Sequence, residues 1–374
     1  MRILLINAVC GTGSTGKICG ALAQELEKQG HTVKIAHGRD NIVPEQYRKY
    51  SLRIGSDLGV RLHGVYTRLT DRHGFGSAGA TKRFLGWAEK FDPELVWLHN
   101  IHGYYINIEL LFGWIKSRPQ MQVKWTLHDC WAFTGHCSYF DAVGCSHWKT
   151  GCHHCPQKGE YPASLLLDGS ASNYARKKQL FTGVRNMTLV VPSYWLESRV
   201  KQSFLKEYPV EVVYNTVNRA VFKPTEGDFR KNHQLEGKRM LLGVASVWEK
   251  RKGLEDFIQL AGMLDSRYRI VLVGLTEEQA KKVPDSILCI SRTNNQQELA
   301  EIYTTADLLV NPSREETFGM TILEAHCCGT KSVVYEKTAC EEVALLCGGI
   351  VVKQGVEHLH RAIVAQFPDP AERM

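Results

Sequence analysis

Short apolar runs alternate with longer segments of helical periodicity in the first half of the chain. Residues 2–7 form a largely apolar run, residues 17–28 carry apolar side chains at helical spacing, and residues 31–36 contain β-branched and apolar residues typical of a second strand. Further β-branched or apolar runs stand at 95–99 and 123–128. Strands that alternate with helices predict a parallel sheet with helices on both faces.

The same alternation restarts in the second half. We expect a strand at 240–245, a helix at 254–264 and a strand at 269–274. Three more short apolar runs continue the series, at 287–290, 308–310 and 332–335. The predicted fold class is therefore α/β, with two tandem Rossmann-like, doubly wound domains. Ligands of such sheets bind beyond the carboxyl ends of the strands, so we expect the site in a cleft between two facing domains.

Chain length supports the same division, because 374 residues are more than a domain with a single hydrophobic core usually contains. The first sheet is expected to end at residues 189–192, and the polar stretch 223–238 lacks strand character. We therefore predict an acceptor-side domain at residues 1–195 and a donor-binding domain at residues 196–374.

Charge and cysteine content narrow the functional class. Residues 1–190 carry 23 Lys and Arg against 14 Asp and Glu, whereas the rest of the chain carries 23 against 25. A basic first half predicts an anionic partner such as nucleic acid, phospholipid or a phosphorylated ligand. The chain has no run of 18 apolar residues and no leader before its first strand, so we expect a cytoplasmic protein. Twelve cysteines in such a protein predict thiols or metal ligands rather than a disulfide framework.

A glycine-rich segment, Gly11–Gly16, follows the first strand and satisfies the spacing G-x-G-x-x-G. Amides at the start of the following helix, near Gly13 and Ser14, are expected to bind a phosphate. A nicotinamide enzyme would also need an acid after the second strand, and that place holds Arg39 instead. Arg39 suits the 2′-phosphate of NADP, so an NADP-dependent oxidoreductase stays open as an alternative.

The second half contains two glutamates, Glu316 and Glu324, on either side of a Phe-Gly turn. A short helix is expected to begin at about Gly319, so one carboxylate precedes the helix and the other projects from it. The amides of residues 317–320 lie at the helix N-terminus, where they can bind anionic or hydroxyl oxygens.

This block resembles the signature of retaining glycosyltransferases of family 4, which have the two-domain GT-B architecture. Further segments resemble the same family in the same order along the chain. These segments are Gly11–Gly16, Asn215–Asn218 with Phe222–Pro224, and Lys252 with Gly253. The resemblance covers most of the chain.

The resemblance assigns roles to the matching residues. Glu316 would hydrogen-bond hydroxyls of the donor sugar, and Glu324 would bind the ribose of the nucleotide. Lys252 would neutralise the departing diphosphate, and His128 would lie beside the reacting sugar. The implied catalytic residues are His128, Glu316 and Lys252, and the implied donor-binding residues are Gly13, Ser14, Arg251, Lys252, Thr317, Phe318, Gly319 and Glu324.

Three features depart from the family pattern. Ser246 replaces a usual arginine, so the second phosphate cation is either Arg251 or absent, and Asn218 replaces a usual aspartate. The chain also ends without the long final helix common in the family. The implied mechanism is a front-face displacement with retention, in which the departing phosphate oxygen accepts the proton of the acceptor. No cofactor or divalent metal is expected to be required for catalysis, since the chain has no Asp-x-Asp.

A predicted insertion at residues 136–156 of the first domain contains four cysteines. Their spacing fits a structural zinc, but buried or redox-active thiols and disulfides stay open. The four candidate metal ligands are Cys137, Cys145, Cys152 and Cys155. Residues 126–155 resemble a family-4 subgroup that builds bacterial surface polysaccharides such as colanic acid, O-antigen and capsule. No nucleic-acid partner is expected, because the segment lacks a basic recognition helix.

Residues 52–87 interleave arginine and lysine with apolar side chains. A helix there either packs its apolar face on the sheet or lies on an anionic membrane. The function implied by the resemblance is sugar transfer from a UDP- or GDP-sugar to a lipid-linked oligosaccharide, with peripheral membrane contact through the first domain at the inner face of the cytoplasmic membrane. Alternatives are the NADP-dependent oxidoreductase and a catalytically degenerate nucleotide- and zinc-binding scaffold.

Overall fold

The computed structural model describes residues 1–39 and 42–368. The chain forms two compact units, Met1–Val213 and Tyr214–Met374. The division lies later than the predicted boundary after residue 195, which falls inside helix α6 (Tyr194–Val200). The reason is strand β7 (Val210–Val212), which pairs with β6 (Met187–Val191) and so completes the first sheet.

The remaining elements of the first unit are β1 (Arg2–Asn7), α1 (Gly13–Lys28), β2 (Thr32–His37), β3 (Ser51–Arg53), α2 (Asp57–Thr70), α3 (Ala78–Phe91), β4 (Leu95–Leu98), α4 (Ile108–Lys116), β5 (Gln122–Thr126) and α5 (Ser170–Phe181). Those of the second unit are α7 (Phe229–Asn232), β8 (Arg239–Val244), α8 (Leu254–Met263), β9 (Tyr268–Val273), α9 (Glu277–Ala280), β10 (Ile287–Ile290), α10 (Gln296–Thr305), β11 (Leu308–Asn311), α11 (Met320–Cys327), β12 (Ser332–Tyr335), α12 (Ala339–Leu346), β13 (Ile350–Val352) and α13 (Val356–Gln366).

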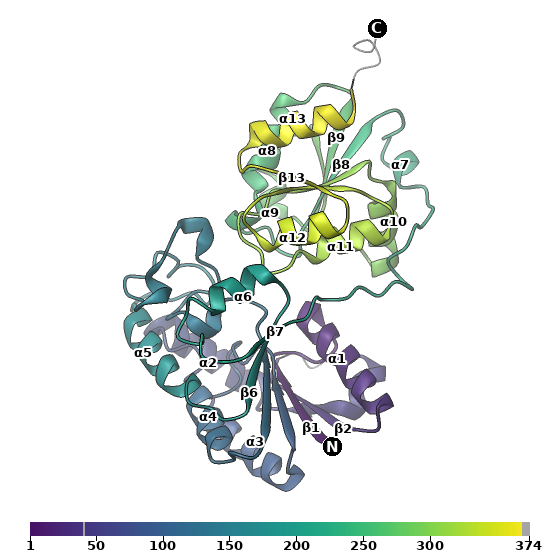
Figure 1. The fold of residues 1–374 in the computed structure, drawn as a ribbon. Helices are drawn as coiled ribbons and strands as arrows, with labels where there is room; N and C mark the ends of the chain where they lie inside the picture. The colour runs from purple at the N-terminus through teal and green to yellow at the C-terminus, as the bar shows by residue number, and fades with distance from the viewer. Residues whose placement is uncertain (40–41, 369–374) are drawn as a thin grey trace. The chain divides into compact units, whose positions relative to one another are not determined.

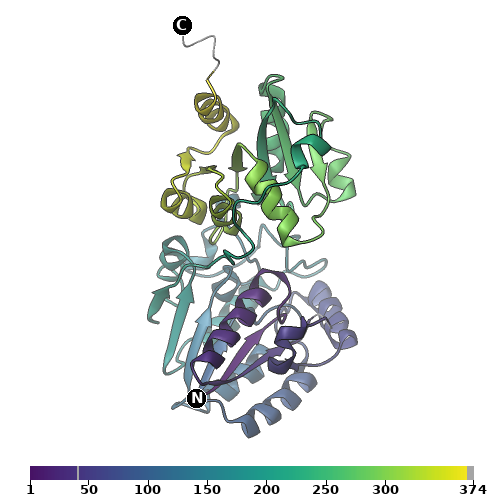
Figure 2. The ribbon, with the colours of Figure 1, turned by 90° about the vertical axis from the view of Figure 1, so that its right-hand side faces the viewer.

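Within the described residues, each unit contains one sheet whose strands all pair in parallel. The first sheet has the order β3-β2-β1-β4-β5-β6-β7 and the second has the order β10-β9-β8-β11-β12-β13. Figures 1 and 2 show helices on both faces of each sheet. The predicted pair of doubly wound α/β domains is confirmed.

Burial of both sheet faces explains why a central strand such as β1 is almost entirely apolar. In β1, Leu4 and Ile6 face one hydrophobic core while Ile3 and Leu5 face another. Successive side chains of a strand point to opposite faces, so a strand covered on both sides has no polar face. Among the described residues, no helix combines the length and apolar character needed to cross a membrane.

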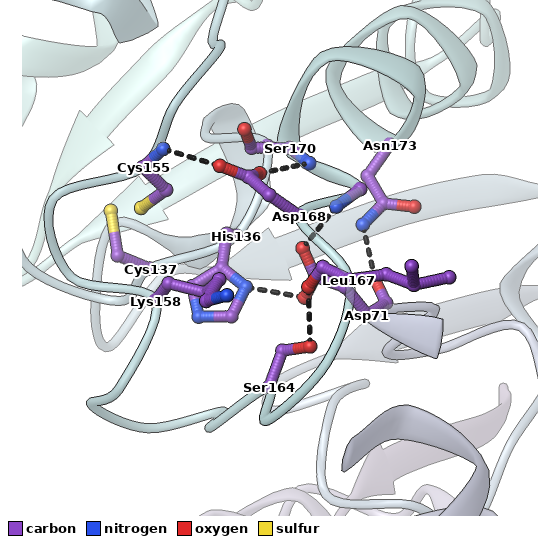
Figure 3. Close-up of polar contacts among 12 residues, drawn as sticks. Asp71, His136, Cys137, Cys155, Lys158, Ser164, Leu167, Asp168, Ser170 and Asn173 are labelled. Carbon is purple, nitrogen blue, oxygen red and sulfur yellow. Dashed lines mark hydrogen bonds and ion pairs between the residues drawn. The ribbon is translucent and has the colours of Figure 1, made fainter. Parts of the chain in front are cut away.

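A buried carboxylate, Asp71, joins the end of α2 to the cysteine-rich segment and to α5. Asp71 adopts a left-handed conformation with φ of 58° at the end of α2. Its Oδ2 accepts a hydrogen bond of 2.7 Å from the Gly169 amide, and its Oδ1 contacts His136 Nδ1. Asn173 Nδ2 donates to the Asp71 carbonyl oxygen, as Figure 3 shows. Three segments far apart in the sequence therefore depend on one residue.

The pKa of His136 reflects this pairing. Burial alone lowers that pKa, but the hydrogen bond and negative charge of Asp71 outweigh burial and raise it above its ordinary value. Protonation of His136 therefore stabilises the folded state relative to the unfolded state.

We predict that Asp71→Asn lowers the free energy of unfolding by about 3 kcal/mol, because it breaks a buried ion pair. The folded wild-type chain binds the His136 proton more tightly than the unfolded chain. Stability from this pair is therefore complete below about pH 6.5 and is lost as pH rises through the raised pKa. Differential scanning calorimetry at pH 6 and pH 8 should show this loss in the wild type and not in the variant.

Asp92→Asn is the matched control for Asp71→Asn. Asp92 also ends a helix in a left-handed conformation, with φ of 48°, but its ion pair with Arg2 is solvent-exposed. Exposed pairs contribute between zero and about 1 kcal/mol. Equal losses in the two variants would contradict the role of Asp71.

Candidate functional site

The second sheet reverses its direction of winding between β8 and β11, which are neighbours in the sheet. Loops from their carboxyl ends, residues 245–253 and 312–319, lie side by side. The Arg314 amide donates to the Arg251 carbonyl oxygen at 2.8 Å, joining the two loops. In doubly wound sheets this reversal is where ligands bind.

Three charged side chains meet at this reversal. Lys252 Nζ lies 2.5 Å and Arg251 Nη1 lies 2.9 Å from Glu316 Oε2. Arg251 also donates from Nε to Glu249 Oε2 at 2.8 Å, which fixes its guanidinium. The Glu316 side chain is only 16% exposed. Lys252, Arg251 and Glu316, assigned to the site from sequence, are therefore brought together.

The pKa of Glu316 shows which charge state this cluster favours. Burial raises the pKa, but the positive charges of Lys252 and Arg251 outweigh burial and hold it below its ordinary value. Glu316 is therefore ionised at neutral pH. It acts as the counter-ion of two cations in the chain without ligand.

The turn into α11 requires glycine at position 319. Gly319 has φ of 102°, and a Cβ there would lie 2.9 Å from Ile322 Cδ1 and 3.2 Å from Cys340 Sγ. The preceding Thr317 is buried, and the buried Phe318 packs in the hydrophobic core. The Phe318 side chain therefore has a packing role. We expect a ligand at this turn to contact the backbone amides.

Glu324 projects from α11 and is oriented by α10. The buried Tyr303 donates its hydroxyl to Glu324 Oε2 at 2.9 Å. Burial, together with the negative charge of Glu324, raises the pKa of Tyr303 well above its ordinary value. Sequence analysis missed Tyr303, because a tyrosine among the apolar positions of a helix carries no signal beyond burial.

A glycine and a half-buried ion pair hold the two loops against the sheet. Gly253 has φ of 76°, and a Cβ there would lie 2.5 Å from the Pro312 carbonyl oxygen. Arg314 Nη2 lies 2.9 Å from Asp256 Oδ1, which also accepts a hydrogen bond of 3.1 Å from the Tyr335 hydroxyl. Lys252 is therefore placed by a turn that only glycine can complete at this spacing.

We predict that Gly253→Ala destabilises the chain by about 2–3 kcal/mol, from the left-handed conformation and the clash with Pro312. Gly262→Ala is the control, since Gly262 lies inside α8 with nothing within 4 Å of an added Cβ. The control should be neutral or up to about 1 kcal/mol more stable, because alanine favours helix. Thermal unfolding of both variants checks this, and equal melting temperatures would contradict it.

In the first unit, His128 follows β5 and contacts the histidine that follows β4. His99 Nδ1 lies 3.0 Å from His128 Nε2, and Trp125 Nε1 donates to the His99 carbonyl oxygen at 3.1 Å. His102 Nε2 lies 2.9 Å from Asp129 Oδ2. A small pocket opens here, and its lining includes His99, His102, Trp125, His128, Asp129 and Trp131. Sequence analysis identified His128 but missed its histidine neighbours.

Burial lowers the pKa of His128 to about 4, so its imidazole is uncharged near neutral pH. It can therefore take part in hydrogen bonds there without adding a positive charge.

We predict that the His128 ring stays neutral down to about pH 5 and gains its proton only below that. Burial disfavours the charged ring, so the folded pKa lies below the usual value of about 6.5. Nitrogen chemical shifts of the histidine rings, assigned with a His128→Gln variant, would measure this titration. A midpoint near 6.5 would contradict the prediction.

The glycine-rich segment of the first unit is explained in part by packing. A Cβ on Gly11 would lie 2.4 Å from Tyr47 Cδ2, and one on Gly16 would lie 2.9 Å from Val9 Cγ2. Gly13 and Ser14 are exposed at the start of α1, where an anion can reach the helix amides. Their predicted contact with a nucleotide held by the second unit stays a prediction.

The four cysteines within residues 137–155 do not form the predicted zinc-binding set. Among residues 1–39 and 42–368, no group of three or more His, Cys, Asp or Glu is arranged to hold a metal ion. A hydrogen bond from Cys137 lowers the pKa of Cys155 to about 7, and the Gly135 amide donates to Cys152 Sγ at 3.2 Å. All twelve cysteines lie within the described residues, and none of them forms a disulfide there. Zinc stays a prediction that this geometry does not support.

The fold and the charged cluster together define a class. A doubly wound parallel sheet with two cations and a helix N-terminus at its reversal point is an α/β domain suited to an anionic ligand such as a nucleotide. Residues 225–373, which lie within the second unit, match the family described as glycosyl transferases group 1.

Two curated relatives are similar over part of the chain. The putative colanic acid biosynthesis glycosyl transferase WcaC of Escherichia coli K12 is 28% identical over 193 residues, 48% of this chain and 45% of that protein. The N,N'-diacetylbacillosaminyl-diphospho-undecaprenol alpha-1,3-N-acetylgalactosaminyltransferase of Campylobacter jejuni is 30% identical over 118 residues, 30% of this chain and 31% of that protein. The chain thus spans less than half the length of these relatives.

Solved structures match the fold of the whole chain. The structure of Anabaena Alr3699/HepE in complex with UDP and glucose has a TM-score of 0.66 at 13% identity, over 100% of this chain and 91% of that one. Glycosyltransferases with the GT-B fold are among the similar structures. The predicted resemblance to GT-B glycosyltransferases is confirmed, whereas the assignment to family 4 stays a prediction.

Proposed function

We propose that the protein is a retaining glycosyltransferase that transfers a sugar from a UDP- or GDP-sugar to a lipid-linked oligosaccharide in bacterial surface polysaccharide synthesis. The observation that carries this proposal is the contact of Lys252 and Arg251 with Glu316 at the reversal point of the second sheet. The names of the curated relatives and the UDP in the Anabaena structure support the choice of reaction and donor.

The cluster matches the charges of a nucleotide sugar. Lys252 and Arg251 would exchange the Glu316 carboxylate for the diphosphate, with the amides before α11 adding hydrogen bonds. Glu316, released from its counter-ions, would accept hydrogen bonds from hydroxyls of the donor sugar. Glu324, held by Tyr303, would accept the ribose hydroxyls.

Charge develops on the diphosphate as the bond to the sugar breaks. Lys252 and Arg251 face that charge with fixed positions, which stabilises the transition state more than the bound donor. We propose that the acceptor hydroxyl attacks from the face that the diphosphate leaves, so that the configuration is retained. The departing phosphate oxygen takes the proton of the acceptor, and no protein base is needed.

We propose that the first unit binds the acceptor. His128 is uncharged and half-buried at the carboxyl end of β5, so it can hydrogen-bond a sugar hydroxyl without competing with Lys252 for the diphosphate. A relative whose name includes diphospho-undecaprenol supports a lipid-linked acceptor. We also propose contact of the first unit with the cytoplasmic face of a membrane, where such an acceptor would be reached.

We predict that Lys252→Ala lowers kcat about 100- to 1000-fold, the usual effect of removing one group that stabilises transition-state charge. A thermal-shift series with UDP, GDP, ADP and their sugar conjugates first identifies the donor. Release of nucleoside diphosphate from that donor, with a lipid-diphosphate sugar as acceptor, then measures turnover. Lys250→Ala is the matched control, because Lys250 is an exposed lysine of the same turn.

Each alternative gives a different outcome. Equal turnover in Lys252→Ala and Lys250→Ala would contradict the site. Nucleotide binding without turnover under any donor would favour the degenerate scaffold. A thermal shift with NADP and none with nucleotide sugars would favour the oxidoreductase.

A further inference from the structure

Helix α2 buries two polar residues and exposes four apolar ones. Leu58, Leu62, Val65 and Leu69 are between 44 and 66% exposed, whereas His63 and Thr67 are buried. The spacing of four, three and four residues places the exposed apolar side chains on one helix face. This arrangement is the reverse of the usual surface helix.

Hydrogen bonds on the buried face fix this orientation. His63 Nδ1 lies 2.9 Å from Ser77 Oγ, and the Gly76 amide donates to His63 Nε2 at 3.1 Å. Thr67 Oγ1 donates to the His63 carbonyl oxygen at 3.0 Å. Rotating α2 to bury its leucines would break the His63 contacts and leave buried polar groups without partners.

A second apolar segment lies beside the end of α2. Leu165, Leu166 and Leu167, the leucine loop, are between 57 and 68% exposed. The Leu165 amide donates to the Arg68 carbonyl oxygen at 2.8 Å, which joins this loop to α2.

The backbone of the leucine loop is held although its side chains are exposed. Ser164 Oγ donates to the Leu167 carbonyl oxygen at 2.6 Å, as Figure 3 shows. Lys158 Nζ donates to the Leu166 carbonyl oxygen at 3.4 Å. Asp168, next in the chain, accepts hydrogen bonds from the Cys155 and Ser170 amides at 2.8 and 2.9 Å. The loop is therefore built to present three leucines to its surroundings.

The exposed side chains of α2 and the leucine loop form one surface, named here the leucine surface. Isolated exposed leucines are ordinary, but a joined set of seven apolar side chains marks an interaction site.

Charged side chains next to the leucine surface indicate the partner. Arg61, Arg68 and Arg72 are exposed on α2 or directly after it, and the first 190 residues carry a net charge of +9. Three exposed acids lie nearby in the sequence. Asp57 pairs with Arg53, Asp168 accepts two backbone amides, and the third is Glu160. An apolar face with a cationic rim complements an anionic bilayer, where leucines enter the acyl region and arginines meet phosphates.

We propose that the leucine surface inserts shallowly into an anionic lipid bilayer, with Arg61, Arg68 and Arg72 at the level of the lipid phosphates. This deepens the proposed membrane contact of the first unit by assigning it to named residues. Only the reason for membrane contact, access to a lipid-linked acceptor, rests on the proposed function, since insertion itself needs no catalysis.

Vesicle flotation tests the proposal with the full chain. Vesicles of phosphatidylcholine alone are compared with vesicles that contain about one third phosphatidylglycerol, at low and high salt. We expect at least tenfold tighter binding to the anionic vesicles at low salt, and weaker binding at high salt, because each arginine near the surface adds about fivefold in affinity.

Substitution of leucines separates insertion from charge alone. The double variant Leu62→Gln with Leu166→Gln should lose at least tenfold in binding. The matched control is Leu345→Gln with Leu346→Gln, two leucines of the second unit that are 62 and 65% exposed, and it should bind as the wild type does. All four positions are exposed, so both double variants should keep the wild-type melting temperature.

Three results would overturn the proposal. The first is equal binding of the wild type to neutral and anionic vesicles, and the second is full binding of the Leu62 and Leu166 double variant. The third is a dimer of the wild type in solution that is absent in this variant. The last result would assign the surface to a second copy of the chain. Failure of the proposed function is a separate result, since it is measured as turnover and nucleotide binding of Lys252→Ala.

Discussion

In each sheet the direction of winding reverses between two neighbouring parallel strands, and the candidate site depends on this reversal. In the second sheet, β8 and β11 are neighbours, but the chain leaves them in opposite winding directions. Their loops therefore separate from the sheet beside each other with no crossing helix between them. Lys252 and Glu316 are 64 positions apart in the sequence, yet this topology alone brings their loops together. The first sheet follows the same rule at β1 and β4, where the Asn100 amide donates to Asn7 Oδ1 at 3.2 Å.

Buried charge and buried polarity organise the rest of the first unit. Asp71 ends α2, accepts the Gly169 amide and pairs with His136, so the leucine loop and α2 are positioned by the same carboxylate. His63 adds a second fixed point farther up α2. Both residues are buried polar groups with specific partners, and such groups define one orientation where apolar packing alone would allow several. The exposed leucines of α2 are the consequence of that orientation.

Sequence reasoning was accurate where periodicity and turn chemistry are local. The strands at 287–290 and 332–335 were predicted to the residue, because each is a short apolar run with sharp ends. Of the candidate site, Lys252, Arg251 and Glu316 were predicted and are in contact. Tyr303 and His99 were missed, because their roles depend on a partner far away in the sequence. The outward face of α2 was also beyond reach, since periodicity shows that a helix has an apolar face but not which way it points.

The ion pair of Glu316 with Lys252 and Arg251 bears on which anions this cluster would hold. An anion that displaces Glu316 must itself attract Lys252 and Arg251. The Glu316 carboxylate, whose side chain is 16% exposed, is then left without its two counter-ions. Inorganic phosphate offers charge to the cations but, as an anion itself, little for a carboxylate acceptor, so part of the loss is uncompensated. A nucleotide sugar offers a diphosphate to the cations and hydroxyl donors to Glu316 at the same time. Under the proposed function, the buried counter-ion therefore acts as a selectivity device, because only a ligand with both parts satisfies every charge that it separates.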